Sequence, residues 1–245
     1  MNSVETMNPP RGHEDEPAET PSPFLVLLRH PDLAARACMS GEGRTELTRT
    51  ALLCLLICGA TYGGVVGSFR GDLQVLYAAI KLPLVLLGAL VVTAPALWAF
   101  GATRDTPWPL RSATSLVLVA AGRAALVLAA LTPLLWLAID LYAGYHLSAM
   151  LGAFTLALGG LAGLGVVGRG LAGMKITALV LSSLVFMLGL AQFGWTLRPW
   201  LVRPGSDDVV LVRTERGVGV FSSIAESARY GLRDPSGDST EGDLW

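Results

Sequence analysis

Four ionisable side chains stand within or beside long apolar stretches of the sequence. Lys81 and Arg123 lie inside apolar segments, and Asp140 and Arg198 each follow the end of such a segment. Charged groups are costly in apolar surroundings, so their presence there indicates a functional role by default. Structural anchoring is the preferred interpretation of Arg123, and the alternative is a polar path along which Lys81 and Arg123 bind an anion.

The positions of these groups along their segments predict different roles. Lys81 lies near one end of its segment, where its stem can reach the interface, and Asp140 is expected in the same leaflet of a membrane, where the two can pair. Arg123 lies about ten residues into its segment, which is roughly 15 Å at helical rise. No Asp or Glu is expected at that depth, so Arg123 must find backbone carbonyls, a hydroxyl, a lipid phosphate or water.

The residue sets of common hydrolases and metal sites are missing from the sequence. It contains neither a Gly-x-Ser-x-Gly elbow nor a His-Glu-x-x-His motif, and Asp140 has no second aspartate with which to form an intramembrane pair. His146 has no His or Cys near it in the sequence. We therefore expect no catalytic, cofactor or metal site and do not expect an enzyme.

Three cysteines, Cys38, Cys54 and Cys58, are an odd number and do not suggest a disulfide framework. Cys54 and Cys58 are four residues apart in an apolar run and would share one face of a helix. Without further soft ligands nearby, small packing residues are the preferred interpretation.

Glycines recur at intervals of four in two apolar segments. The first reads Gly59-x-x-x-Gly63-x-x-x-Gly67, and another contains Gly159-x-x-x-Gly163. Such spacing lines one helix face with small residues and lets a second helix backbone approach closely. The pattern fits packing inside a compact bundle, and it also fits a face for homo-oligomers.

These residues belong to elements that the composition defines. Apolar residues make up 52% of the 245-residue chain, the mean hydropathy is +0.55, and charged residues make up 15%. Residues 51–200 hold only 11 charges, whereas the 95 flanking residues hold 26. A charge-poor block between polar ends is typical of a membrane domain, and the net charge of −1 argues against a nucleic-acid partner.

The predicted fold is all-α, a polytopic transmembrane helical bundle with about five spans and polar tails. Each span needs about 20 mostly apolar residues, and the expected spans are 51–69, 75–100, 113–139, 148–168 and 176–195. Pro83 and Pro95 could kink the second span or make it re-entrant, which would give an even span count. A re-entrant segment would favour a transporter.

Polar segments flank this domain. Residues 1–23 are expected to form a disordered tail, and residues 24–50 an interfacial segment with a short helix from Asp32 to Met39. Residues 201–245 are a second polar tail with a short amphipathic helix over about 217–232. Near the span ends, eight basic residues against four favour a cytoplasmic N-terminus, and five spans would place the C-terminus outside.

Three short pieces, Gly67-Ser68-Phe69-Arg70-Gly71, Ala79-Ile80-Lys81-Leu82-Pro83 and Gly194-Trp195-x-Leu197-Arg198-Pro199, occur in this order. Together they resemble a group of bacterial multi-span proteins similar to Yip1-domain proteins. The resemblance covers about residues 24–232. It implies about five spans, a cytoplasmic N-terminal tail and a role in membrane organisation or trafficking. The stretch Trp200-Leu201-Val202 departs from the pattern of the group after its Leu-Arg-Pro element.

The expected function is non-enzymatic membrane organisation, scaffolding or a trafficking-like role. The alternative is a small transporter or channel subunit, with Lys81 and Arg123 lining a polar path. The expected partners are membrane lipids, with a second copy of the chain or another membrane protein as further possibilities. The expected location is the bacterial cytoplasmic membrane.

Overall fold

A computed structural model describes residues 21–68, 73–101, 108–141, 145–172, 180–181, 184–185 and 187–188. Within these residues, the secondary structure is helical and contains no strand. The helices are α1 (Pro23–Arg29), α2 (Pro31–Ser40), α3 (Arg44–Ser68), α4 (Leu73–Gly101), α5 (Leu110–Asp140) and α6 (Tyr145–Gly170). The predicted all-α fold is therefore confirmed.

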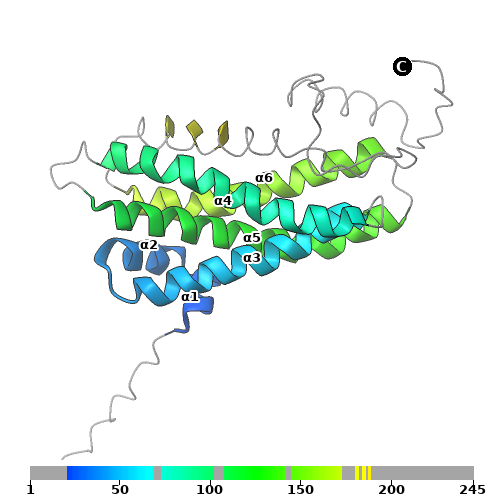
Figure 1. Ribbon diagram of the computed structural model, residues 1–245. Helices are drawn as coiled ribbons and strands as arrows, with labels where there is room; N and C mark the ends of the chain where they lie inside the picture. The colour runs from blue at the N-terminus through cyan, green and yellow to red at the C-terminus, as the bar shows by residue number, and fades with distance from the viewer. Residues whose placement is uncertain are drawn as a thin grey trace, which may run out of the picture.

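The four long helices lie side by side in one bundle, and α5 is its central element (Figure 1). Helix α5 packs against α3, α4 and α6, and also against the short helices α1 and α2. Helices α3 and α5 begin at the same end of the bundle, where the Arg44 guanidinium of α3 donates a hydrogen bond to the Ser112 hydroxyl of α5 at 3.2 Å. Helix α4 ends there too, since the Trp98 indole donates to the carbonyl of Trp108, just before α5, at 3.1 Å.

Four helices are long and apolar enough to cross a membrane: Arg44–Ser68, Leu73–Ala99, Leu110–Asp140 and Met150–Gly170. The protein is thus an integral membrane protein, and these helices coincide with four of the five expected spans. The expected fifth span, 176–195, lies mostly outside the described residues, where helix is described at 180–181, 184–185 and 187–188. Most of the tail 1–23, Arg198 and the segment 201–245 also lie outside them.

The helix containing Pro83 and Pro95 is uninterrupted rather than re-entrant. Helix α4 runs from Leu73 to Gly101 with both prolines inside it. Proline is tolerated in membrane helices where neighbouring helices compensate for the freed backbone groups. Pro83 packs against Gly59 of α3, where a Cβ atom would lie 3.4 Å from Cγ of Pro83, an ordinary van der Waals contact.

The interfacial segment folds into a helical hairpin, α1–α2, which we define as residues 23–40. Helix α1 begins after Ser22, whose hydroxyl accepts from the amide of Leu25 at 3.4 Å. Each helix has proline in its first turn, where no backbone donor is needed. Helix α2 ends at Gly41, whose φ of 93° is left-handed and suits glycine. The expected helix from Asp32 to Met39 lies within α2.

Two apolar clusters form the core, one in each half of the bundle. The first joins the hairpin to the starts of α3 and α5 and to the ends of α4 and α6, and includes Leu27, Ala34, Cys38, Leu97, Leu116 and Val166. The second joins α3, α4 and α5 deeper in the bundle, and includes Leu55, Tyr62, Leu82, Leu86, Leu128 and Leu135. The hairpin thus belongs to the folded core.

Candidate functional site

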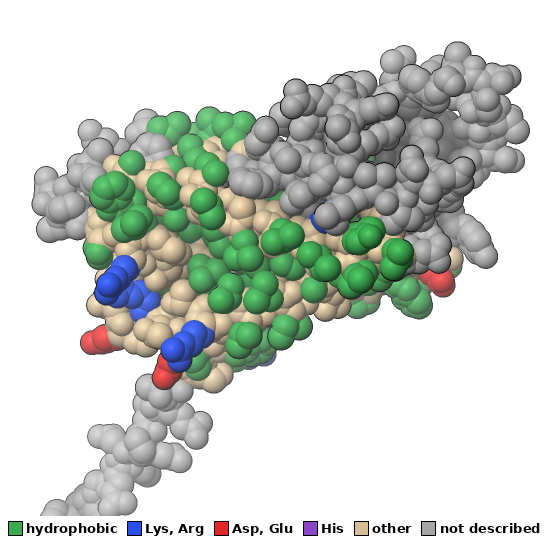
Figure 2. Space-filling model, in the orientation of Figure 1, with side chains coloured by type: hydrophobic (Ala, Val, Ile, Leu, Met, Phe, Trp, Pro, Cys, Tyr) green, Lys and Arg blue, Asp and Glu red, His purple; other side chains and the backbone are tan. Residues whose placement is uncertain are grey.

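Positive charge gathers in one half of the bundle, which we call the arginine-rich end. It comprises the hairpin, the starts of α3 and α5, and the ends of α4 and α6. The seven arginines among the described residues all belong to it: Arg29, Arg36, Arg44, Arg49, Arg111, Arg123 and Arg169. In the face seen in Figure 2, basic side chains, all of them arginines at this end, cluster at the left, while the flank of the bundle is broadly hydrophobic. The described carboxylates of the arginine-rich end are those of Asp32, Glu42 and Glu46.

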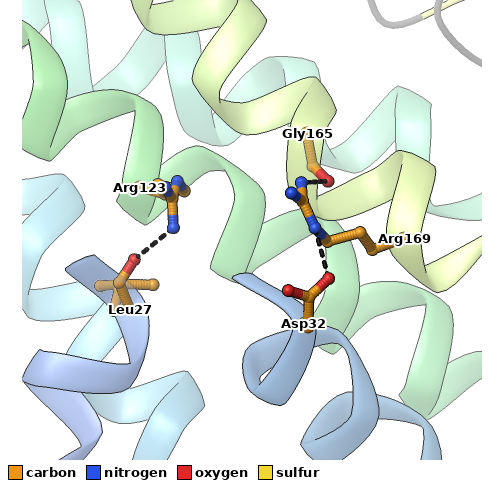
Figure 3. A network of polar contacts seen from close by, with 5 residues as sticks. All are labelled: Leu27, Asp32, Arg123, Gly165 and Arg169. Atoms are coloured by element: carbon orange, nitrogen blue, oxygen red, sulfur yellow. Dashed lines mark hydrogen bonds and ion pairs between the residues drawn. The ribbon is translucent and has the colours of Figure 1, made fainter. Parts of the chain in front are cut away.

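Arg123 anchors the hairpin to the central helix. Its Nη1 donates to the backbone carbonyl of Leu27 at 3.0 Å (Figure 3). Leu27 lies in the last turn of α1, where carbonyl groups have no partner within the helix. The guanidinium therefore closes the C-terminal end of α1. A backbone carbonyl was among the partners that the sequence suggested for Arg123.

Arg169 makes a second connection, between α6 and α2. Its Nε lies 2.5 Å from Oδ1 of Asp32, and its Nη1 donates to the Gly165 carbonyl at 2.8 Å (Figure 3). The two side chains are 46% and 63% exposed, so solvent weakens the Coulomb attraction between them. The second hydrogen bond fixes the direction in which the Arg169 side chain points.

The face of the hairpin that meets the bundle is apolar and well packed. Leu27, Ala34 and Cys38 have no exposed surface. Burial raises the pKa of the Cys38 thiol to about 12, and the nearby Arg44 opposes this shift. Phe24, on the outer side of α1, remains 48% exposed. The hairpin therefore has one side packed against the bundle and another that presents apolar surface.

The opposite half of the bundle holds a group of buried polar side chains. Tyr62 of α3 shares a 2.5 Å hydrogen bond with the hydroxyl of Thr155 on α6, and its own hydroxyl also reaches the Gly152 carbonyl at 3.3 Å. Thr155 donates to the same carbonyl at 2.9 Å. Tyr62 is 1% exposed and Thr155 is fully buried. This network ties α3 to α6 across the interior.

Helix α4 contributes two further polar groups to that half. Gln74 and Lys81 are each 1% exposed, and residues seven apart lie on one face of a helix. Among the residues that the structure describes, neither amide atom of Gln74 has a hydrogen-bond partner. Such a buried amide costs free energy and calls for an explanation. Gln74, Tyr62 and Thr155 were not predicted from the sequence, although the seven-residue spacing between Gln74 and Lys81 is a signal that could have identified Gln74.

Lys81 and Arg123 do not share one site. Arg123 lies near the level of Ala51, because its neighbour Gly122 packs directly against that residue of α3. Lys81 lies nearer the level of Gly63, which packs against Ala78 one turn earlier in α4. The two cations therefore sit in different halves of the bundle, and Arg123 faces α1.

Asp140 is exposed at the end of α5, in the half of the bundle that contains Lys81. The pairing of Lys81 with Asp140 stays a prediction, and Arg198 lies outside the described residues.

The glycine-lined faces meet other helices of the same chain. A Cβ atom on Gly63 would overlap the Ala78 carbonyl of α4, and one on Gly67 would lie 2.6 Å from the Gln74 carbonyl. On α6, a Cβ atom on Gly159 would lie 2.9 Å from Cγ of Leu128, and one on Gly163 would lie 2.8 Å from the Ala120 carbonyl. Both stripes thus permit close packing within the bundle.

No family model, curated protein or solved structure matches the chain. Within the part of the chain that the structure describes, no three His, Cys, Asp or Glu side chains are grouped so that they could hold a metal ion. Two arrangements of side chains in this structure could bind a ligand. One is the arginine-rich end, which can bind anions, and the other is the buried polar group around Gln74 and Lys81.

Proposed function

We propose that the protein is a non-enzymatic membrane scaffold whose arginine-rich end organises lipids or partner proteins. The observation that carries this proposal is the fixed attachment of the hairpin α1–α2. Arg123 holds the end of α1 and Arg169 holds Asp32 of α2, while the exposed side of the hairpin displays apolar groups. A rigid, positively charged element of this kind suits a docking platform.

The distribution of arginines supports a cytoplasmic position for this end. Lys and Arg near the ends of spans favour the cytoplasmic side, and the described arginines gather at the end where the N-terminal hairpin lies. We therefore propose a bacterial cytoplasmic membrane and a cytoplasmic N-terminus. The resemblance to Yip1-domain proteins points to the same class of role, membrane organisation or trafficking.

Detaching the hairpin tests the scaffold directly. Arg123→Leu removes the donor to the Leu27 carbonyl, and Arg111→Leu is a matched control that removes an exposed arginine at the same end. We expect single-molecule tracking in the cells that make the protein to show a confined fraction for the wild type. The fraction should fall in the Arg123 variant and remain in the Arg111 variant.

Undocking can be verified independently through Cys38, which is fully buried against the bundle. With the two cysteines of α3 replaced by alanine, maleimide should label Cys38 faster in the Arg123 variant than in the control. If labelling rises while the confined fraction stays the same, the hairpin does not carry the scaffold function and the proposal is wrong.

A second candidate, a small transporter, is favoured by the buried amide of Gln74 and by Lys81 on the same helix face. Polar and ionisable groups inside a membrane bundle often mark a path for a solute or ion. We place Lys81, and not Arg123, on such a path. Its test is chloride efflux from liposomes, compared for the wild type, Lys81→Met and Lys81→Arg. Efflux that depends on the charge of Lys81 supports this candidate, and the absence of efflux in all three removes it.

A further inference from the structure

An open groove of about 250 Å³ lies at the arginine-rich end, between the hairpin and the end of α6. Four residues of α2 and three at or after the end of α6 line it: Asp32, Ala35, Arg36, Met39, Arg169, Gly170 and Ala172. The groove therefore combines two guanidinium groups, one carboxylate and an apolar surface from Met39 and the small residues.

The charges in this groove favour an anion. Arg169 donates one hydrogen bond to Asp32 and one to the Gly165 carbonyl. A guanidinium has five N–H donors, so these two bonds use only part of its capacity. Asp32 thus holds Arg169 in place and offsets one positive charge, while Arg36 adds a second. The groove has a net positive charge, and its guanidinium groups can engage a phosphate through paired hydrogen bonds.

The neighbouring surface is apolar. Leu33, beside Asp32 in α2, is 40% exposed, and Ala35 and Met39 of the same helix line the groove itself. Exposed apolar side chains next to a basic groove suit an amphipathic ligand, whose charged head enters the groove while its chains lie along the protein. A free inorganic anion would make no use of this surface.

We infer that this groove binds the phosphate of an anionic phospholipid, with Arg36 and Arg169 as the residues that contact the headgroup. Basic pockets between membrane helices on the cytoplasmic side are suited to such headgroups. The inference rests on the proposed function, because it names one partner of the arginine-rich end and takes that end to lie at the membrane surface.

The experiment measures lipid binding to the full-length protein in a neutral detergent. Short-chain phosphatidylglycerol is titrated, with phosphatidylcholine and inorganic phosphate as separate probes, and the midpoint of thermal unfolding is recorded. Arg36→Gln is the decisive variant, and Arg111→Gln is the matched control because Arg111 is exposed at the same end but does not line the groove. Each variant loses one positive charge.

We expect phosphatidylglycerol to raise the midpoint of the wild type and of the Arg111 variant, with little effect from the other two probes. The Arg36 variant should need about tenfold more lipid, the cost of one lost charge-assisted hydrogen bond. Arg36→Lys should restore part of the affinity. The hydrogen bonds described above that hold the hairpin come from Arg123 and Arg169 and not from the Arg36 side chain, so the Arg36 variants should fold.

Three outcomes would overturn the inference. Equal weakening in the Arg36 and Arg111 variants would indicate diffuse surface attraction. An equal effect of inorganic phosphate would indicate a soluble anion. No effect of phosphatidylglycerol on the wild type would remove the site altogether. The scaffold proposal fails separately, because unchanged tracking of the Arg123 variant leaves the lipid titration unaffected.

Discussion

Replacing Gly63 by alanine should destabilise the bundle because two helix backbones meet at this residue. A Cβ atom there would overlap the Ala78 carbonyl oxygen and lie 2.9 Å from its carbon and 3.1 Å from Cα of Ala79. Favourable contacts between carbon atoms are about 3.5–4.0 Å. Helices α3 and α4 would have to separate by roughly half an ångström or more, and gaps of that size forfeit about a quarter to a half of each contact along the seam.

Overpacking of this kind costs about 1–3 kcal/mol. Alanine itself gains about 1 kcal/mol over glycine through helix propensity. Gly152 supplies the matched control, since a Cβ atom there would meet nothing within 4 Å. We expect Gly63→Ala to be about 1–3 kcal/mol less stable than Gly152→Ala, because both alanines lie inside helices and share the propensity gain, and only the one at position 63 has the steric cost.

The assay is equilibrium unfolding of the purified protein in mixed micelles, with light scattering to record its assembly state. A Gly63 variant as stable as the Gly152 variant would refute the packing argument. If the Gly63 variant kept its stability but changed its assembly state, the glycine stripe would serve self-association instead.

Three further predictions use the buried polar groups. Tyr62→Phe removes the hydroxyl that bonds Thr155 and should cost about 1 kcal/mol in the same unfolding assay; no loss would mean that this link between α3 and α6 is not made. Gln74→Leu removes an unpaired buried amide and should stabilise the protein by about 1–3 kcal/mol, whereas a loss of stability would reveal a partner for the amide. Cys38, in a chain without the other cysteines, should react slowly with maleimide at pH 8. Burial raises the pKa of this thiol from 9.0 to about 12. The contribution of the protonated thiol to the free energy of unfolding is therefore fully present below pH 9 and is lost as the pH rises towards 12. Fast labelling at pH 8 would contradict its burial.

The architecture follows from features that are visible in the sequence. Apolar runs of sufficient length predict the helices α3 to α6, because a membrane span must satisfy its backbone groups internally. Pro31 and the residues after it predict α2, because proline suits the first turn of a helix. The uninterrupted helix through Pro83 could not be distinguished from a re-entrant segment, since that choice depends on how α4 packs against α3 and α5.

The site depends on contacts between distant residues, which hydrophobic patterns do not encode. Arg123 and Leu27 are 96 residues apart, and Tyr62 and Thr155 are 93 apart. The sequence indicates that Arg123 needs an oxygen partner but not which one. Gln74 was overlooked because a single neutral amide barely changes the apolar character of a segment, although its burial is costly.

The division of polar groups between the two halves of the bundle has a functional consequence. At the arginine-rich end, Arg123 and Arg169 form hydrogen bonds with groups of the same chain, and these bonds hold the hairpin in position. In the opposite half, the amide of Gln74 has no hydrogen-bond partner within the described part of the bundle. Stability accounts for those bonds but not for the buried amide, since leucine would fill the site of Gln74 at lower cost. A stabilising Gln74→Leu change would therefore leave function as the reason for a polar residue there, and chloride efflux measured on the same variant would show whether that function is transport.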